Sequence, residues 1–214
     1  MGDPSLWGAL ELFQALQRYD NEGVTILLDR NGYYTDKKEV YQNYYTVIHN
    51  YFEGIWKKPK FQYEDEVNLE EYEELPTKFI LGKWNSKPRR VLPKEDMICY
   101  SFMYPNKEMF EGAHFETENR LHDKENVMTL LDYLDGYNLG KTRGDCPTML
   151  ARKLDAIQKS KLYIGSYCTW DVIAKTVFGV PTMFVYPNKI VSEKKQIKMN
   201  NPYKYFDEKL YRHK

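Results

Sequence analysis

The chain has 214 residues, of which 42% are hydrophobic, with 31 basic and 31 acidic side chains. This length and apolar content are sufficient for one large domain or two small lobes with ordinary cores. The balanced charge excludes a global field that would favour nucleic acid or an anionic membrane, so a polyanionic partner has to be recognised by a local patch.

The first half of the chain predicts helices alternating with short strands. In chain order these are a helix over 6–16, a strand over 24–28, a helix over 37–56 and a strand over 79–81. The stretch 57–76 is acidic and irregular, which predicts a poor contribution to the core. The basic, proline-bracketed stretch 85–95 predicts a boundary between two lobes.

The second half has a regular alternation of strand and helix. Its predicted elements are a strand over 97–102, a helix over 123–134, a strand over 137–139, a helix over 147–160, a strand over 162–164, a helix over 169–179 and a strand over 182–186. Such alternation predicts a parallel sheet with helices on both faces. Ligands collect at the carboxyl ends of such strands, in the loops that begin near Ser101, Gly140 and Gly165. The tail after Pro187, lysine-rich and then aromatic, predicts a closing helix that packs on the first lobe.

The segment Lys161–Tyr186 is the most informative part of the chain, because it predicts strand, turn, helix and strand in succession. Gly165 permits the turn, and Thr169 is placed to cap a helix that ends at Gly179. A helix that opens just after a parallel strand directs its free N–H groups and positive dipole end at the ligand side of the sheet. This pattern favours an anion such as a phosphate.

Other motifs point to no alternative chemistry. Gly140-Lys141-Thr142 fails as a phosphate loop because three residues, rather than four, separate Gly136 from Gly140. Lys141 and Arg143 are still placed to contact a diphosphate as point charges. The four histidines are scattered without metal-ligand spacing, and the three cysteines predict reduced thiols. Asp65 and Glu66 lie in an acidic run that is typical of a solvated face.

No apolar stretch approaches the roughly 20 residues that span a bilayer, and the N-terminus lacks the pattern of a signal peptide. These features lead us to expect a cytoplasmic protein.

The stretch Leu150–Tyr186, with Lys161-Leu-Tyr-Ile-Gly165 and Gly179-Val-Pro-Thr182, resembles the donor-binding half of GT-B glycosyltransferases. The closest resemblance is to the heptosyltransferase-like family, which uses ADP-sugars. Gly2-Asp3 and the helix after it resemble the Gly-Asp segment near that family's N-terminus. The resemblance implies an α/β fold of two small Rossmann-like lobes with parallel sheets. Residues 1–90 would form the acceptor-side lobe, 91–190 the nucleotide-sugar-binding lobe, and 191–214 a tail that packs back on the first lobe.

The resemblance also implies a reaction, the metal-independent transfer of a sugar from a nucleotide-sugar to an acceptor hydroxyl, without a further cofactor. Asp3 would be the general base, although a helix cap ahead of Pro4 is an alternative role for it. The donor diphosphate would lie against the turn and helix start, aided by basic side chains. The implied donor-binding residues are Lys107, Lys141, Arg143, Gly165, Ser166, Tyr167, Cys168, Thr169 and Trp170.

The acceptor is open. The basic loop Lys83–Arg90 and the tail lysines Lys194, Lys195 and Lys198 could address a polyanion such as hydroxymethylated DNA, the acceptor of some viral glycosyltransferases. Ordinary solvated charges are the alternative interpretation.

The chain also departs from the family. Tyr167, Cys168, Thr169 and Val172 stand where the family has an aspartate, a small residue, a glycine and a histidine. The chain begins at Met1, without the strand that precedes Gly-Asp in the family. These departures favour a second hypothesis, a non-catalytic nucleotide-binding or scaffold protein. A small kinase is a third, disfavoured by the failed phosphate-loop spacing.

Overall fold

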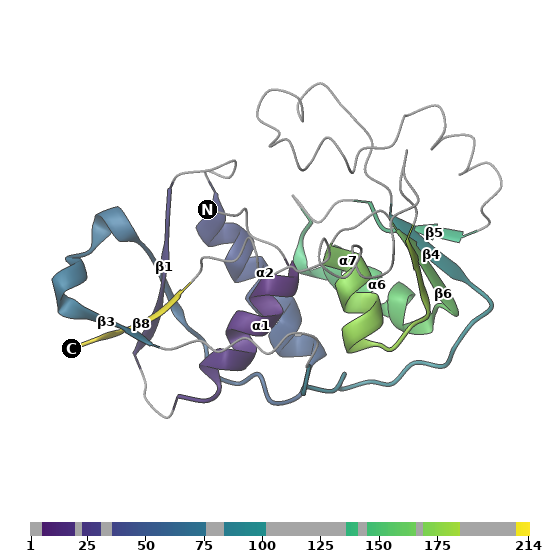
Figure 1. Cartoon of the computed structure of the whole chain (residues 1–214), viewed down its shortest axis with the longest axis horizontal. Coiled ribbons are helices and arrows are strands. Elements are labelled where there is room, and N and C mark those ends of the chain that lie inside the picture. The colour runs from purple at the N-terminus through teal and green to yellow at the C-terminus, as the bar shows by residue number, and fades with distance from the viewer. Residues whose placement is uncertain are drawn as a thin grey trace, which may run out of the picture. The chain divides into compact units, whose positions relative to one another are not determined.

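The structure is a computed structural model that describes residues 6–19, 23–30, 36–75, 84–101, 136–140, 145–165, 169–184 and 209–214. The chain divides into two compact units. The first comprises Met1–Val91, Thr142–Ala151 and Pro202–Lys214, and the second comprises Leu92–Lys141 and Arg152–Asn201. The described residues form one four-stranded sheet in each unit, and helices accompany both sheets (Figure 1). This arrangement confirms the predicted α/β class.

The sheet of the first unit has the strand order β2-β1-β8-β3. Strand β1 (Val24–Leu28) pairs in parallel with β2 (Lys60–Tyr63) and antiparallel with β8 (Lys209–His213). Strand β3 (Tyr72–Leu75) pairs antiparallel with β8 on its other side. The sheet is therefore mixed, whereas the sequence predicted a parallel sheet in this lobe. The difference arises because β8 lies between β1 and β3 and runs antiparallel to both.

Two helices supply the core of the first unit. Helix α1 (Leu6–Leu16) is buried at every position except Gln14, in agreement with its predicted apolar face. The Phe13 ring meets the Tyr45 ring edge-on at a centroid distance of 5.4 Å, which joins α1 to α2 (Lys37–Tyr51). Helix α2 ends at Tyr51 rather than near Trp56, because Phe52 adopts an extended backbone.

The acidic stretch 57–76 contributes to the core, so the prediction for it was wrong. It contains β2 and β3, joined by two short 3-10 turns. Phe61 and Tyr63 of β2 and Leu75 of β3 are each at most 8% exposed. Their charged neighbours point outward, so the mean polarity of the stretch concealed two half-buried strands.

The tail was expected to form a closing helix, but its last described part is a strand, β8. The predicted strand 79–81 and helix 123–134 lie outside the described residues.

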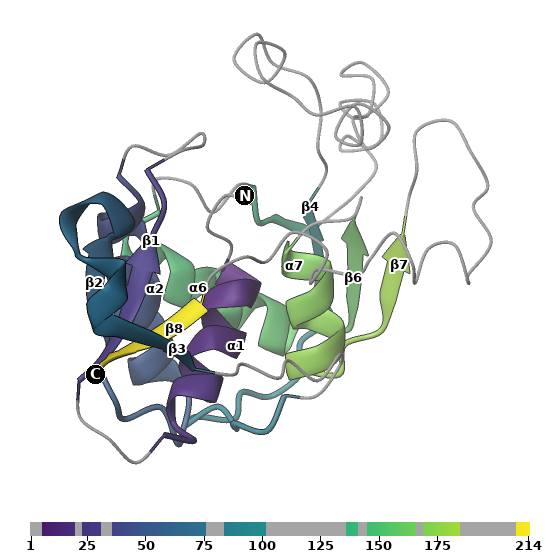
Figure 2. The same ribbon diagram turned by 60° about the vertical axis from the view of Figure 1, so that its left-hand side comes forward.

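The second unit has the strand order β5-β4-β6-β7, and all three pairings are parallel. The strands are β4 (Ile98–Ser101), β5 (Gly136–Asn138), β6 (Leu162–Gly165) and β7 (Thr182–Phe184). Figure 2 shows β6 and β7 running side by side in the same direction. The predicted parallel sheet is confirmed here.

Helix α6 (Pro147–Lys159) begins at the predicted proline, and its residues are divided between the two units. The predicted helix over 169–179 is shorter and changes type. Its α-helical part, α7 (Thr169–Val172), passes into a π-helical segment, η3 (Ile173–Val177). The backbone N–H of Phe178 donates to the Ile173 carbonyl, and Gly179 follows with a φ of +61°. Thr169 is the first residue of α7 rather than its cap.

Among the described residues, no helix combines the length and the apolar character needed to cross a membrane.

Replacing Ile26 by alanine tests the importance of β1. Ile26 is fully buried at the centre of this strand. We expect Ile26→Ala to lower the free energy of unfolding by about 2 to 5 kcal/mol, because it leaves a cavity. The control is Val91→Ala, at an 84% exposed side chain, with an expected change within about 0.5 kcal/mol. Urea denaturation followed by circular dichroism measures both, and equal costs would contradict the assignment of Ile26 to the core.

Candidate functional site

The second sheet changes the direction of its strand order at β4. From β4 the chain places β5 on one side, and it then places β6 on the other side with β7 beyond it. Ligands of open parallel sheets bind at such a switch point, outside the carboxyl ends of the strands. Ser101 and Gly165 are register partners at the carboxyl ends of β4 and β6. The candidate donor site therefore lies beside this pair.

Hydrogen bonds tie the β5 loop to its neighbours at this edge. The Gly140 carbonyl oxygen accepts from the Ser101 hydroxyl at 3.4 Å and from the Trp170 indole Nε1 at 3.2 Å. The Gly140 amide in turn donates to the Asn138 side-chain oxygen at 3.0 Å, and Gly140 has a φ of +61°. These bonds connect the ends of β4 and β5 to the start of α7. They also hold the indole of Trp170, which is 2% exposed, in a fixed position.

Gly165 is required for a reason that differs from the one predicted. It is not among the described glycines with positive φ, so the turn does not demand it. A Cβ atom at this position would instead overlap Oδ1 of Asp171, and it would lie 2.6 Å from a ring carbon of Tyr163. Glycine is therefore needed because a buried carboxylate approaches the backbone here.

Charged side chains are buried behind the same edge. Asp171 is 2% exposed and Lys153 of α6 is 8% exposed. The Lys153 ammonium lies 6.0 Å from the centre of the Trp170 ring, at the limit of a cation–π contact. The site thus combines an indole, a carboxylate and an ammonium. The sequence identified only Trp170 of these three, because its periodicity does not tell which polar residues of a helix face inward.

Only part of the predicted donor site is described. Gly165, Thr169 and Trp170 lie together where β6 ends and α7 begins. The other predicted site residues and the tail lysines lie outside the described residues. The site residues concerned are Asp3, Lys107, Lys141, Arg143, Ser166, Tyr167 and Cys168, and the lysines are Lys194, Lys195 and Lys198. The α-helical part of this helix has only four residues, and the π-helical η3 continues it without a break.

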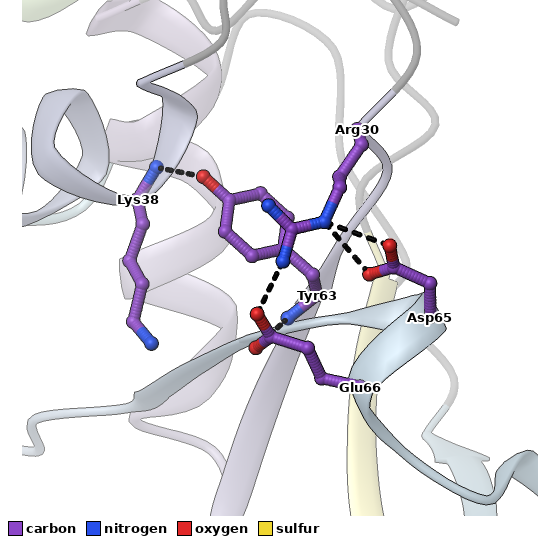
Figure 3. Close-up of polar contacts among 5 residues, drawn as sticks. All are labelled: Arg30, Lys38, Tyr63, Asp65 and Glu66. Carbon is purple, nitrogen blue, oxygen red and sulfur yellow. Dashed lines mark hydrogen bonds and ion pairs between the residues drawn. The ribbon is translucent and has the colours of Figure 1, made fainter.

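A second polar cluster lies at the carboxyl ends of β1 and β2 in the first unit (Figure 3). Arg30 follows β1, and its Nε donates to both carboxylate oxygens of Asp65 at 3.0 and 2.7 Å. The Nη2 of Arg30 donates to Glu66. The guanidinium carbon lies 3.9 Å from the centre of the Tyr63 ring, whose hydroxyl accepts from the Lys38 amide at 3.4 Å.

This Arg30 cluster joins the loops that follow two parallel strands. Its charged side chains are roughly half exposed, so they remain accessible at the surface. Asp65 and Glu66 are not only a solvated acidic run, because both contact the same guanidinium. Their oxygens are engaged by Arg30, which argues for a positioning role rather than proton transfer. The sequence did not indicate Arg30, whose partners are 35 and 36 positions away.

The described part of the chain offers few side chains for metal binding or thiol chemistry. Within it, no three His, Cys, Asp or Glu residues are grouped so as to hold a metal ion. Cys99 and Cys146 are free thiols. Cys99 is fully buried in β4, and this burial raises its pKa to about 11.

Comparison of the chain with protein-family models, with curated proteins and with solved structures finds no match.

The close approach at Gly165 is tested with a double-mutant cycle. Gly165→Ala should cost about 1 to 3 kcal/mol of unfolding free energy, because the added methyl group overlaps Asp171 and Tyr163. In an Asp171→Ala background the cost should fall by at least about 0.5 kcal/mol, because the nearest obstacle is gone. An identical cost in both backgrounds would show that Asp171 does not restrict this position.

Thiol reactivity tests the burial of Cys99. In a Cys168→Ser variant at neutral pH, a thiol reagent should label Cys146 rapidly and Cys99 only after unfolding. Because the pKa of Cys99 is raised, its thiolate population, and with it any residual labelling, should increase as the pH approaches 11. Mass spectrometry of the labelled peptides measures both sites, and equal native rates at neutral pH would contradict the assignment.

Proposed function

We propose that the chain is a metal-independent glycosyltransferase of GT-B type, related to the heptosyltransferase-like family, that moves a sugar from a nucleotide-sugar to an acceptor hydroxyl. One observation supports this proposal above all. The segment that resembles a donor-binding half coincides with the switch point of a parallel sheet, where Ser101 and Gly165 meet.

In this proposal the donor diphosphate lies against Gly165–Trp170. Lys107, Lys141 and Arg143 offset the negative charge that develops on the departing nucleoside diphosphate. Asp3 takes the proton of the acceptor hydroxyl as its oxygen bonds to the anomeric carbon of the sugar. The bond between that carbon and the diphosphate oxygen breaks in the same step. Modified DNA, as used by viral enzymes of this type, is the acceptor class we propose, and the cytoplasm is the proposed location.

A non-catalytic nucleotide-binding or scaffold protein is the alternative. Tyr167, Cys168 and Thr169, which stand in place of the family's residues, favour it. A kinase would require magnesium and ATP, so the same binding experiment separates it from both.

The first test is a thermal-shift panel of UDP, GDP, ADP, CMP and ATP, with and without magnesium. A ligand that binds only the native state raises the melting temperature. We expect one nucleoside diphosphate to raise it by roughly 5 to 10 °C without magnesium, at a concentration about 100-fold above its Kd. No response to any nucleotide would contradict both nucleotide-binding proposals and favour a scaffold protein. A response only to ATP with magnesium would favour a kinase.

The second test separates catalysis from binding. With the nucleotide identified, Asp3→Ala should reduce sugar transfer by about 100-fold or more and leave the thermal shift unchanged. The matched control is Asp36→Ala, which removes an aspartate that precedes α2 and makes no side-chain cap. Nucleotide binding without transfer from any matching donor would favour the non-catalytic alternative.

A further inference from the structure

Two chain segments bring an unbalanced positive charge together in the first unit. Residues 51–60 and 84–91 carry six lysines and arginines against one carboxylate, Glu53. The whole chain, by contrast, has a net charge of zero. We call the exposed part of this surface the Trp56 patch, which consists of Trp56, Lys58, Lys87, Arg89 and Arg90. Within the described ranges, none of its basic side chains forms an ion pair.

Backbone hydrogen bonds hold the two segments side by side. The Glu53 amide donates to the Lys87 carbonyl at 2.8 Å, and the Arg89 amide donates to the Tyr51 carbonyl at 2.9 Å. Phe52 and Pro88 form an antiparallel bridge between these bonds. Charges that are remote from each other in the sequence therefore share one surface.

Two glutamines anchor the same segments: Gln14 of α1, and Gln17, which directly follows this helix. Gln14 accepts from the Asn85 amide at 3.1 Å. Gln17 accepts from the Trp56 and Lys57 amides, both at 2.9 Å, while its own amide group donates to the Phe13 carbonyl. Both segments are therefore anchored at the C-terminal end of α1.

Trp56 is the exposed aromatic group of the patch. Its side chain is 64% exposed, although Ile55 beside it and Phe52 are fully buried. The indole is therefore presented to solvent on an anchored backbone. The Lys57 ammonium lies 4.7 Å from the centre of the indole ring, where it is shielded from solvent and has no hydrogen-bond partner among the described residues.

We infer that the Trp56 patch binds single-stranded nucleic acid. An unpaired base can stack on the exposed indole, while Lys58, Lys87, Arg89 and Arg90 contact the phosphates. A duplex offers no base face to the indole. An anionic membrane would require a wider apolar surface than one indole supplies. The inference does not depend on sugar transfer, because binding can be measured whether or not the nucleic acid is also an acceptor.

Fluorescence anisotropy of a labelled oligothymidylate of about 20 nucleotides tests the inference on the full chain. The wild-type protein should bind at low salt and lose affinity steeply between about 50 and 200 mM salt. Trp56→Ala should weaken binding by about tenfold, and Trp56→Phe should retain most of the affinity because it preserves stacking. Both variants should melt at the wild-type temperature, because the indole is mostly solvent-exposed.

A matched pair of double variants tests the phosphate contacts. Lys87→Ala with Arg90→Ala should weaken binding and reduce the slope of log affinity against log salt by about 1.4. Arg152→Ala with Lys175→Ala removes the same charge from exposed positions elsewhere and should leave the slope unchanged. Equal losses in both double variants would overturn the inference, because they would indicate attraction without a defined patch.

Three further results would overturn the inference. They are no binding at low salt, duplex DNA bound as tightly as the single strand with no effect of Trp56→Ala, and binding to phosphatidylserine vesicles but not to the oligonucleotide. None of these measurements involves a nucleotide-sugar, so their failure is separable from failure of the proposed transferase activity.

Discussion

Parallel pairing of β4 with β6 is the interaction on which the second unit depends. Parallel strands cannot be joined by a tight turn, so the chain has to return across the sheet between them. As a result, the carboxyl ends of all four strands lie at one edge, and Ser101 meets Gly165 there. The first unit follows the same rule more locally, since α2 separates β1 from the parallel β2. In both units, the polar side chains that follow these strands are brought together by topology rather than by proximity in the sequence.

The two edges use their polar groups differently. At the edge of the second sheet the hydrogen bonds are internal, because Trp170 and Ser101 donate to the Gly140 carbonyl. Such bonds fix the shape of the edge. At the edge of the first sheet, Arg30 forms solvent-exposed ion pairs with the carboxylates of Asp65 and Glu66. Exposed ion pairs of this kind contribute little to stability, so this cluster can exchange its partners at small cost.

Apolar runs made much of the fold predictable. Strands β1, β4 and β6 and helices α1 and α6 follow from contiguous or periodic apolar residues. The sequence missed β2 because Phe61 and Tyr63 alternate with polar neighbours inside an acidic stretch, and it missed β8 because its partner strands are remote. The sequence singled out Gly165 as a site residue, but it did not show why this position requires glycine. Its conflict with Asp171 depends on which face of α7 is buried, and local patterns do not determine that.

Strand β8 has a consequence for the order in which the protein is made. It lies between β1 and β3, so neither of these strands has its inner neighbour until residues 209–213 leave the ribosome. The described strands of the second sheet end with β7, at Phe184. During synthesis the second sheet can therefore assemble first. Until β8 is available, the edge of β1 that pairs with β8 stays unpaired, and all five residues of β1 are buried in the finished fold. Such an edge is a template for wrong pairing, which makes the interval before β8 emerges the point at which the nascent chain is most prone to aggregate.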